Sequence, residues 1–406
     1  MATPAFRFGD FEVDVEQFQV RQAGAPVHVE PQVYDVIAHL VANRHRVVTK
    51  EEMLDAVWGD RFVSESTLST RINMARKALG DDGRRQAVIK TVFGRGFQFV
   101  AEGVDDDGPD EDSPGASQPP TPRTRDVIRF VETDDGARLG YATSGDGPVL
   151  LKAANWMTHL EFDRESPIWR HWIDDLSTRC SLIRYDERGC GLSDWNVDDF
   201  TFDTWVRDLH TLADHLELER FPLLGISQGA AVAIAFAAQF PERVSGLLLV
   251  GAYPRGRLVR ATTEDELRQA ALDVELARAG WGIPDSPFMQ VFASQFMPDA
   301  DRSQWNAFND LQAKTTSPDN AVSFLETFAH IDVTDFAPKV ECPTLLVHSR
   351  DELRVPAANA WEIASLIPDA ELVSLPSRNH ILQADEPAWD RFLSVVDEFL
   401  ATVAPS

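Results

Sequence analysis

The stretch FPLLGISQGAAVAIAFAA, residues 221–238, decides the fold of the larger part of this chain. Its first residues form a continuous apolar run, which is typical of a buried strand in a parallel sheet. Residues 225–229, Gly-Ile-Ser-Gln-Gly, then match the pattern G-x-S-x-G, in which a sharp strand-to-helix turn exposes a serine hydroxyl. The flanking glycines let the strand and the helix approach closely. We therefore predict that Ser227 is a nucleophile at the end of a strand.

Alternating strand and helix patterns surround this stretch. We expect strands at residues 127–133, 137–145, 149–155, 180–186, 221–227, 244–252, 344–350 and 371–376. Helical periodicity indicates helices at residues 205–216, 228–240, 356–366 and 389–403. Strands that alternate with helices in this way predict a parallel sheet covered by helices on both faces.

A histidine and an acid follow the serine at suitable places. His380 comes directly after the strand expected at 371–376, where it would accept the serine proton as a general base. Asp351 and Glu352 follow the strand expected at 344–350, and either could orient the histidine. With the loop YDERGCGLS at 185–193, this order of serine, acid and histidine resembles the α/β-hydrolase family across residues 127–402.

The resemblance implies further roles at the site. The family's acid is followed by two residues and then Val-Pro, which points to Glu352 and places Asp351 one residue early; both remain candidates. The backbone N–H groups of Gln228 and Asn155 are expected to form an oxyanion hole. The sequence Lys-Ala-Ala-Asn-Trp, residues 152–156, stands where the family commonly has His-Gly. The missing glycine and the bulky Trp156 therefore call the usual substrate geometry into question.

A long helical insertion separates the strands expected at 244–252 and 344–350. We expect about residues 253–338 to form a cap over the serine. Four aromatic residues are candidates to line a pocket for an apolar or aromatic small molecule: Trp156, Trp281, Phe292 and Trp305. The alternative is that most aromatic residues of this segment pack the core of the cap itself.

The first hundred residues follow a different pattern. Short alternating strands precede helices expected at 31–42, at 49–58 and from about 64–66 to 79, and a hairpin closes the segment at 87–101. This order predicts an α+β winged helix-turn-helix. Leu68, Ile72, Ala75 and Leu79 form one apolar face of the third helix.

This segment resembles the OmpR/PhoB-type effector domain of response regulators, through VVTKEEMLDAVWG, STLSTRINMARKALGD and KTVFGRGFQFV. The resemblance implies that helix 66–79 enters the major groove of double-stranded DNA. The candidate DNA-binding residues are Arg71, Asn73, Arg76 and Lys77 on this helix and Arg95 in the wing. The alternative is a winged helix used only for contacts with proteins.

Charge is distributed unevenly along the chain, which carries a net charge of −27. Residues 1–101 hold 13 basic and 13 acidic side chains, so the remainder carries the whole deficit. Residues 102–126 are rich in Asp, Pro, Gly and Ser, which predicts a disordered acidic linker. We therefore expect a DNA-binding domain at 1–101 and a hydrolase-fold domain at 127–406.

The composition also excludes several classes of protein. No apolar run is long enough to span a membrane, and no signal peptide pattern opens the chain. Three cysteines without zinc spacing indicate a reducing compartment. We accordingly expect a cytoplasmic protein, without a metal or other cofactor and outside the membrane.

Three hypotheses about function follow from these patterns. The first is a transcription regulator, expected as a homodimer, whose hydrolase-like domain senses a small organic ligand with slow or absent turnover. The second is an active hydrolase of an ester, lactone or C–C bond that regulates genes through its winged helix. The third is a scaffold in which the hydrolase fold only dimerises. It is the weakest, because dimerisation alone gives no reason for Ser227 and His380 to stand at their positions.

Overall fold

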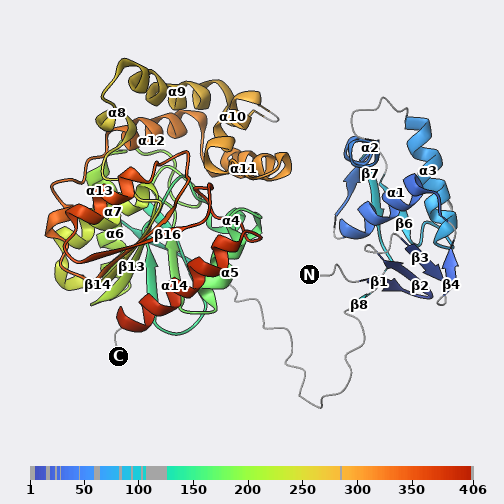
Figure 1. The fold of residues 1–406 in the computed structure, drawn as a ribbon, viewed down its shortest axis with the longest axis horizontal. Helices are drawn as coiled ribbons and strands as arrows, with labels where there is room; N and C mark the ends of the chain where they lie inside the picture. Colours follow the sequence, from blue (N-terminus) through green and yellow to red (C-terminus); the bar gives the residue numbers. More distant parts are fainter. Residues whose placement is uncertain are drawn as a thin grey trace, which may run out of the picture. The chain divides into compact units, whose positions relative to one another are not determined.

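The computed structural model divides the chain into two compact units, Met1–Gln118 and Pro119–Ser406. The described residues are 5–14, 19–22, 25–27, 29–44, 46–58, 65–81, 85–92, 95–101, 104–106, 126–283 and 286–403. Figure 1 shows the smaller unit in blue and the larger one in green to red.

The smaller unit combines two small sheets with three helices. Strands β1 (Ala5–Phe8), β2 (Phe11–Asp14), β3 (Gln19–Gln22), β4 (Ala25–Val27) and β8 (Val104–Asp106) form an antiparallel sheet in the order β4-β3-β2-β1-β8. Helices α1 (Pro31–Ala42), α2 (Lys50–Trp58) and α3 (Glu65–Ala78) follow. Strands β5 (Val48–Thr49), β6 (Ile89–Val92) and β7 (Gly96–Phe99) form the second sheet, in the order β5-β7-β6. The unit is a winged helix-turn-helix, as the sequence predicts.

Strand β8 differs from the sequence prediction. It lies inside residues 102–126, which we expect to be a linker, yet it pairs antiparallel with β1. Backbone groups make this pairing, so the acidic character of the segment does not prevent it. Residues 107–125, which make up most of the predicted linker, lie outside the described residues. The domain limits at 101 and 127 stay predictions.

The apolar face of α3 holds the smaller unit together. Leu68, Ile72, Ala75 and Leu79 are all buried in its core, as the helical spacing predicts. After α3 the Asp81 carboxylate accepts the N–H groups of residues 87, 88 and 89 at 2.9–3.1 Å. This carboxylate therefore connects the end of α3 to the start of the wing hairpin.

The larger unit is built on an eight-stranded sheet with the order β16-β15-β14-β13-β11-β12-β10-β9. Its strands are β9 (Val127–Glu132), β10 (Arg138–Ser144), β11 (Val149–Lys152), β12 (Ser181–Tyr185), β13 (Phe221–Ile226), β14 (Val244–Val250), β15 (Thr344–Ser349) and β16 (Ala370–Leu375). All eight predicted strands are present. Strand β10 runs antiparallel to both β9 and β12, however, so the sheet is parallel only from β12 to β16. The connection between β9 and β10 is a short turn, which joins antiparallel neighbours, whereas parallel ones need a longer crossover.

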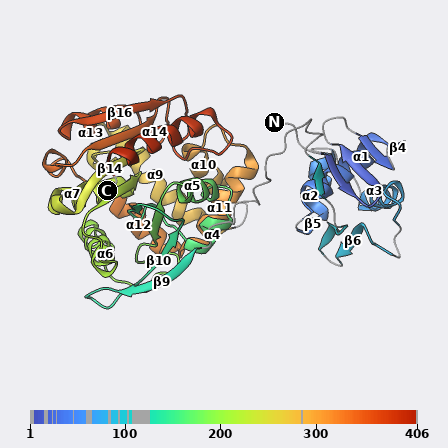
Figure 2. The ribbon, with the colours of Figure 1, turned by 90° about the horizontal axis from the view of Figure 1, so that it is seen from below.

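Helices cover both faces of this sheet, as Figures 1 and 2 show. Helices α5 (Arg170–Ser177) and α14 (Pro387–Val403) pack together through Trp172, Trp389 and Phe392. Helices α6 (Phe202–His215), α7 (Gln228–Gln239) and α13 (Ala358–Leu366) lie on the opposite side. Helix α4 (Leu160–Glu165) precedes α5.

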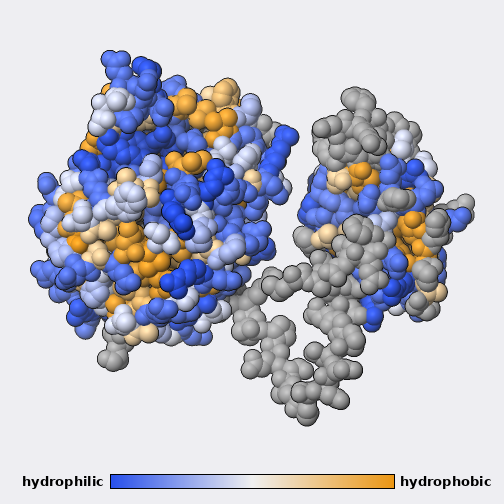
Figure 3. Space-filling model, in the orientation of Figure 1, coloured by the Kyte–Doolittle hydropathy of each residue, from blue (hydrophilic) through white to orange (hydrophobic). Residues whose placement is uncertain are grey.

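Five helices between β14 and β15 form the predicted cap. They are α8 (Arg257–Arg260), α9 (Glu264–Gly280), α10 (Pro287–Phe296), α11 (Arg302–Thr315) and α12 (Pro318–His330). Apolar side chains gather on the surface near α9 and α10 in Figure 3, and Leu272, Phe288 and Val291 of these helices are about half exposed. In the part of the chain that the structure describes, no helix has the length and apolarity that a membrane span requires.

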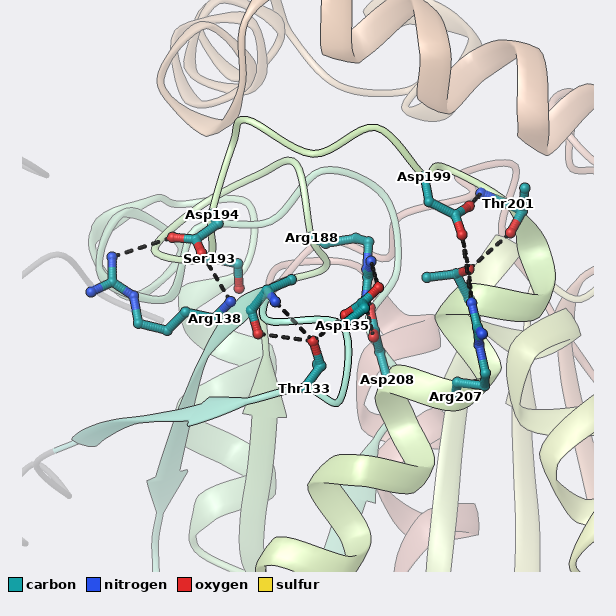
Figure 4. A network of polar contacts seen from close by, with 12 residues as sticks. Thr133, Asp135, Arg138, Arg188, Ser193, Asp194, Asp199, Thr201, Arg207 and Asp208 are labelled. Atoms are coloured by element: carbon teal, nitrogen blue, oxygen red, sulfur yellow. Dashed lines mark hydrogen bonds and ion pairs between the residues drawn. The ribbon is translucent and has the colours of Figure 1, made fainter.

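A buried ion pair braces the loop that follows β12. The Arg188 guanidinium donates to both carboxylate oxygens of Asp208 on α6, at 2.6 and 2.8 Å. It also donates to both oxygens of Asp135 in the turn between β9 and β10, at 2.8 and 3.2 Å (Figure 4). The Arg188 and Asp208 side chains are almost fully buried, whereas the Asp135 side chain is 50% exposed. One guanidinium thus connects a loop, a helix and a turn.

This difference in burial predicts unequal costs for two similar substitutions. We expect Asp208→Ala to lower the free energy of unfolding of the larger unit by about 3–5 kcal/mol, because it leaves a buried cation with one partner fewer. Asp135→Ala should cost about 1 kcal/mol or less, since its side chain is half exposed. Chemical denaturation followed by tryptophan fluorescence measures both, because nine of the 10 tryptophans lie in this unit. Equal costs for the two variants would contradict the role of Asp208.

Candidate functional site

The turn between β13 and α7 presents the Ser227 hydroxyl. Ser227 has φ 53° and ψ −122°, a backbone conformation that residues other than glycine rarely adopt. A Cβ atom at Gly225 would lie 2.6 Å from the Cα of Ala230, and one at Gly229 would lie 2.5 Å from the carbonyl oxygen of Ala154. The two glycines are therefore needed for the close approach of strand, helix and neighbouring loop.

Three side chains form a hydrogen-bonded chain at this turn. The Nε2 atom of His380 lies 2.8 Å from the Oγ atom of Ser227. Its Nδ1 atom lies 2.5 Å from the Oε1 atom of Glu352. Ser227, Glu352 and His380 come from the carboxyl ends of β13, β15 and β16, where ligands of open α/β sheets are bound. This arrangement allows the imidazole to accept the serine proton while the carboxylate holds its orientation.

The structure distinguishes the two acids that the sequence left open. Glu352 is buried, and its Oε1 atom also accepts the Val355 N–H at 2.8 Å. Its Oε2 atom lies 3.3 Å from Nε2 of His348. Asp351 is exposed, and its backbone N–H donates to the carbonyl of Ser377. Glu352 is therefore the acid that meets His380.

A hydrogen bond to the cap and the lack of a side chain at Gly251 both fix the position of the His380 loop. The His380 N–H donates to the carbonyl of Phe296 on α10 at 2.7 Å. A Cβ atom at Gly251 would lie 2.8 Å from Cε1 of the imidazole. Gly251 thus makes room for the ring, a requirement that the sequence pattern did not reveal.

The two residues expected to supply an oxyanion hole lie near the serine turn. Gln228 is the first residue of α7, and Asn155 lies in the loop after β11, against which Gly229 packs. Among the described residues no acceptor meets the backbone N–H of either residue. The next N–H, that of Trp156, donates to Oε1 of the Gln228 side chain at 2.8 Å. Both N–H groups therefore stay candidates for stabilising a negative charge.

Glu187 is a site-supporting residue that sequence reasoning missed. The Gln228 Nε2 atom donates to its Oε1 at 2.7 Å, which holds the amide that binds the Trp156 N–H. Burial raises the pKa of Glu187 to about 8, although the hydrogen bond from Gln228 opposes this change. Burial likewise lowers the pKa of nearby Lys152 to about 8. The place of Glu187 in the loop 185–193 was the signal that could have identified it.

A cavity lies at the serine, beneath helices of the cap. Trp156, Ser227, Gln228, Phe296 and Phe328 are among its lining residues.

Of the four aromatic residues that the sequence offered as pocket candidates, Trp156 lies on the wall of this cavity. Trp281, Phe292 and Trp305 do not line this cavity. The indole N–H groups of Trp281 and Trp305 donate to the carbonyls of Thr316 and Met297, and the Phe292 ring stacks against Trp156. These three residues pack the cap, which was the alternative interpretation.

The lining of the cavity is more polar than the sequence led us to expect. Three arginines, Arg257, Arg260 and Arg354, line it together with Tyr253 and Asp273. Burial raises the pKa of Tyr253 to about 12, so its phenol is neutral. The described residues contain no group of three His, Cys, Asp or Glu side chains suited to a metal ion.

One predicted DNA-binding residue is placed elsewhere. Arg76 is buried, and its guanidinium donates to the carbonyl of Ile89 at 2.9 Å and to the Thr91 hydroxyl at 2.7 Å. It braces α3 against β6 and does not face solvent, so its prediction as a DNA contact is wrong. Arg76 follows Ile72 by four residues, and this spacing already places it beside the apolar face.

The other predicted residues remain accessible to different degrees. Asn73, Lys77 and Arg95 are exposed. Asn73 and Lys77 are four residues apart and thus share one face of α3. Arg71 is half-buried, and its guanidinium contacts the Glu30 carboxylate at 2.6 Å. Asn73 and Lys77 are therefore better placed to reach DNA than Arg71.

Comparison with known families agrees with both units. The chain belongs to the α/β-hydrolase fold family, whose model matches residues 164–387, more than half of its length. Residues 24–99 match the family described as transcriptional regulatory protein, C terminal. The chain thus joins a DNA-binding domain of the OmpR/PhoB type to an α/β-hydrolase domain.

Known relatives cover the hydrolase part. A pyrrolizixenacetamide deacetylase of Xenorhabdus hominickii is 24% identical over 65% of this chain and 95% of its own length. A pimeloyl-[acyl-carrier protein] methyl ester esterase of Nitrosomonas europaea is 26% identical over 64% and 99%. An esterase structure from Exiguobacterium antarcticum covers 68% of this chain and all of its own, with 19% identity and a TM-score of 0.57. This structural likeness concerns the fold.

The hydrogen-bonded chain predicts different effects for the two neighbouring acids. We expect a fluorophosphonate probe to label the protein but not Ser227→Ala. Glu352→Gln should slow labelling by about 10²–10⁴-fold, because the imidazole loses the carboxylate that orients it. Asp351→Asn is the matched control and should change the rate by less than about threefold, since its side chain is exposed. Labelling rates followed by intact-protein mass spectrometry give the answer, and a larger effect of Asp351→Asn would reverse the assignment.

The accessible face of α3 predicts which substitutions change DNA binding. Using a site selected from random DNA, we expect Asn73→Ala to weaken binding by about 1–3 kcal/mol if its amide contacts a base. Lys77→Ala should reduce the slope of log affinity against log salt concentration by about one, because one counterion fewer is released. Arg95→Ala should weaken binding to all sequences alike. Arg76→Ala should instead lower the melting temperature, because the wing loses its brace.

Arg7→Ala serves as the control for these DNA measurements. Arg7 is an exposed cation on β1, outside α3 and the hairpin of β6 and β7, and it pairs with Glu12. Its substitution removes the same charge and should leave affinity nearly unchanged. If Asn73→Ala and Lys77→Ala bound the selected site as well as Arg7→Ala, the DNA-binding assignment of this face would fail.

Proposed function

We propose that this protein is a transcription regulator whose α/β-hydrolase domain binds a small organic effector and hydrolyses it slowly. The winged helix would bind DNA through α3 and the wing, and the effector would occupy the cavity above Ser227. The observation that carries the proposal is the union in one chain of a DNA-binding domain with a hydrogen-bonded Ser227–His380–Glu352 chain. No purely structural role requires that chain.

The chemistry we propose is acyl transfer. The Ser227 oxygen bonds to the effector's carbonyl carbon while its proton moves to Nε2 of His380. The N–H groups of Asn155 and Gln228 stabilise the resulting oxyanion. The bond to the leaving oxygen then breaks, and that oxygen takes the proton from His380. Water repeats these steps, releases the acid and restores the serine.

Two features support slow turnover. Residues of the cap line much of the cavity, so effectors enter and leave past the cap. The bulky Trp156, with φ 54°, occupies one wall of the cavity. Both features favour a site that retains its ligand over one that releases product rapidly.

An active hydrolase of an ester, lactone or C–C bond is the second candidate function. The short contacts of His380 with both partners favour it. The relatives named above include a deacetylase and an esterase, and another is a 2-hydroxy-6-oxo-2,4-heptadienoate hydrolase of Pseudomonas putida, 26% identical over 63% of this chain. Turnover above about 1 s⁻¹ would place the protein in the ordinary range of enzymes and favour this candidate.

A homodimer in the cytoplasm is the form in which we expect the regulator to act. Two winged helices held by a dimer would contact two half-sites, as dimeric helix-turn-helix proteins do. Size-exclusion chromatography with light scattering measures this state directly.

The coupling between cavity and DNA tests the proposed regulator. A fluorophosphonate adduct on Ser227 serves as a defined occupant of the cavity. We expect the adduct to change affinity for the selected DNA site at least tenfold, about 1.4 kcal/mol, because an effector acts only through its different affinity for two states. Fluorescence anisotropy of labelled DNA measures the change. Lengthening the linker should reduce the response if dimer geometry carries the coupling, whereas added salt should reduce it if charged surfaces dock.

Ser227→Ala treated with the same probe is the control, because it meets the reagent without forming the adduct. Its DNA affinity should equal that of the untreated protein. If the adduct leaves DNA affinity, DNA bending and transcription unchanged, the hydrolase domain has a separate task and the regulator proposal is wrong.

A further inference from the structure

The cavity above Ser227 contains more cationic than anionic side chains. Arg257 and Arg260 reach it from α8, and Arg354 reaches it from the loop after β15. Asp273 on α9 is its one carboxylate among the described lining residues. Three guanidinium groups therefore share a small covered space with a single carboxylate.

The partners of these arginines differ. Oδ2 of Asp273 lies 2.5 Å from Arg257 and 2.8 Å from Arg354. The Arg354 guanidinium also lies over the Phe296 ring, 4.6 Å from its centroid. Asp273 thus forms ion pairs with two of the three cations and not with the third.

Arg260 is that third cation. Within residues 126–283 and 286–403 it has no carboxylate oxygen within 4.0 Å. Its Nη1 atom contacts Oδ1 of Asn359 at 3.2 Å, and its guanidinium lies 5.7 Å from the centroid of the Tyr253 ring. Neither neighbour neutralises its charge, so the side chain retains donors for a ligand.

Holding these cations together is electrostatically costly. Burial lowers the pKa of Arg257, and the nearby Arg354 lowers it further. Burial lowers the pKa of Arg260 as well. A largely buried cation without an anion is unfavourable, and an anionic ligand would remove that cost. Fork-shaped guanidinium donors fit a carboxylate in two parallel hydrogen bonds.

We propose that Arg260, assisted by Arg257, binds the carboxylate of a small organic acid whose ester or lactone carbonyl lies at Ser227. This inference rests on the proposed function, since it names the chemical class of the effector for the same cavity. It replaces the apolar ligand that the aromatic residues of the cap led us to expect.

Two esters of equal length test this assignment. Methyl butyrate is neutral, and monomethyl succinate carries a carboxylate in place of the terminal methyl group. Both compete with a neutral fluorophosphonate for Ser227. We expect monomethyl succinate to protect the serine at a concentration at least tenfold lower than methyl butyrate. In Arg260→Gln this preference, the ratio of the two protecting concentrations, should fall at least tenfold.

Arg268→Gln is the matched control. Arg268 is an exposed cation on α9, outside the cavity, and it contacts Asp265 and Glu264. Its loss should not change the preference. Arg260→Lys keeps the charge without the fork and should show an intermediate preference. Melting temperatures verify that each variant is folded.

The outcomes separate this inference from the proposed function. Equal protection by both esters, or an unchanged preference in Arg260→Gln, would overturn the carboxylate assignment. If Ser227 is still labelled in that case, the proposed chemistry stays intact. If Ser227 does not react at all, the proposed chemistry fails. Binding is then tested by titrating the protein with each ester and following tryptophan fluorescence, and Trp156→Phe is the control that identifies the signal of Trp156. A signal from monomethyl succinate that Arg260→Gln abolishes would support the assignment, and no signal would overturn it.

Discussion

The left-handed backbone at Ser227 is the constraint on which the rest of the site depends. A non-glycine residue in such a conformation costs about 1–3 kcal/mol and persists only where its surroundings determine it. Here the Ser227 N–H donates to Val250 of the adjacent strand, and Gly225 and Gly229 allow neighbouring backbones to approach. The turn points the hydroxyl out of the sheet and leaves the first N–H of α7 free. Nucleophile and oxyanion donor therefore share one geometric cause.

Buried polar groups extend this order outward from the turn. Glu187 holds the Gln228 amide, which in turn holds the loop at Trp156. Glu352 holds His380 on one side and contacts His348 on the other. In a low-dielectric interior such groups are costly unless they are hydrogen-bonded, so each one restricts the orientation of the next. The cap adds a further constraint, because its Phe296 carbonyl binds the His380 loop.

The charge distribution relates the two units to their proposed partners. The acidic side chains that give the chain its net charge of −27 lie outside the DNA-binding domain, where they would repel nucleic acid. Within the hydrolase domain the balance reverses locally, since three arginines and one aspartate line the cavity. An acidic protein can thus carry two cationic surfaces, one for DNA and one for a small anion.

The sequence by itself determined the features that repeat locally along the chain. Strand and helix periodicity located the eight strands of the larger sheet, and the G-x-S-x-G turn with its downstream histidine located Ser227 and His380, because each pattern depends on neighbouring residues. Only the tertiary structure decided between Asp351 and Glu352. It also buries the Arg76 side chain against the wing. Finally, it brings Arg260, Asp273 and Arg354 together in one cavity. The latter three are separated by many residues in sequence and meet only when the cap folds over the sheet. Periodicity specifies which face of an element a residue occupies, whereas packing between distant elements decides what that face touches.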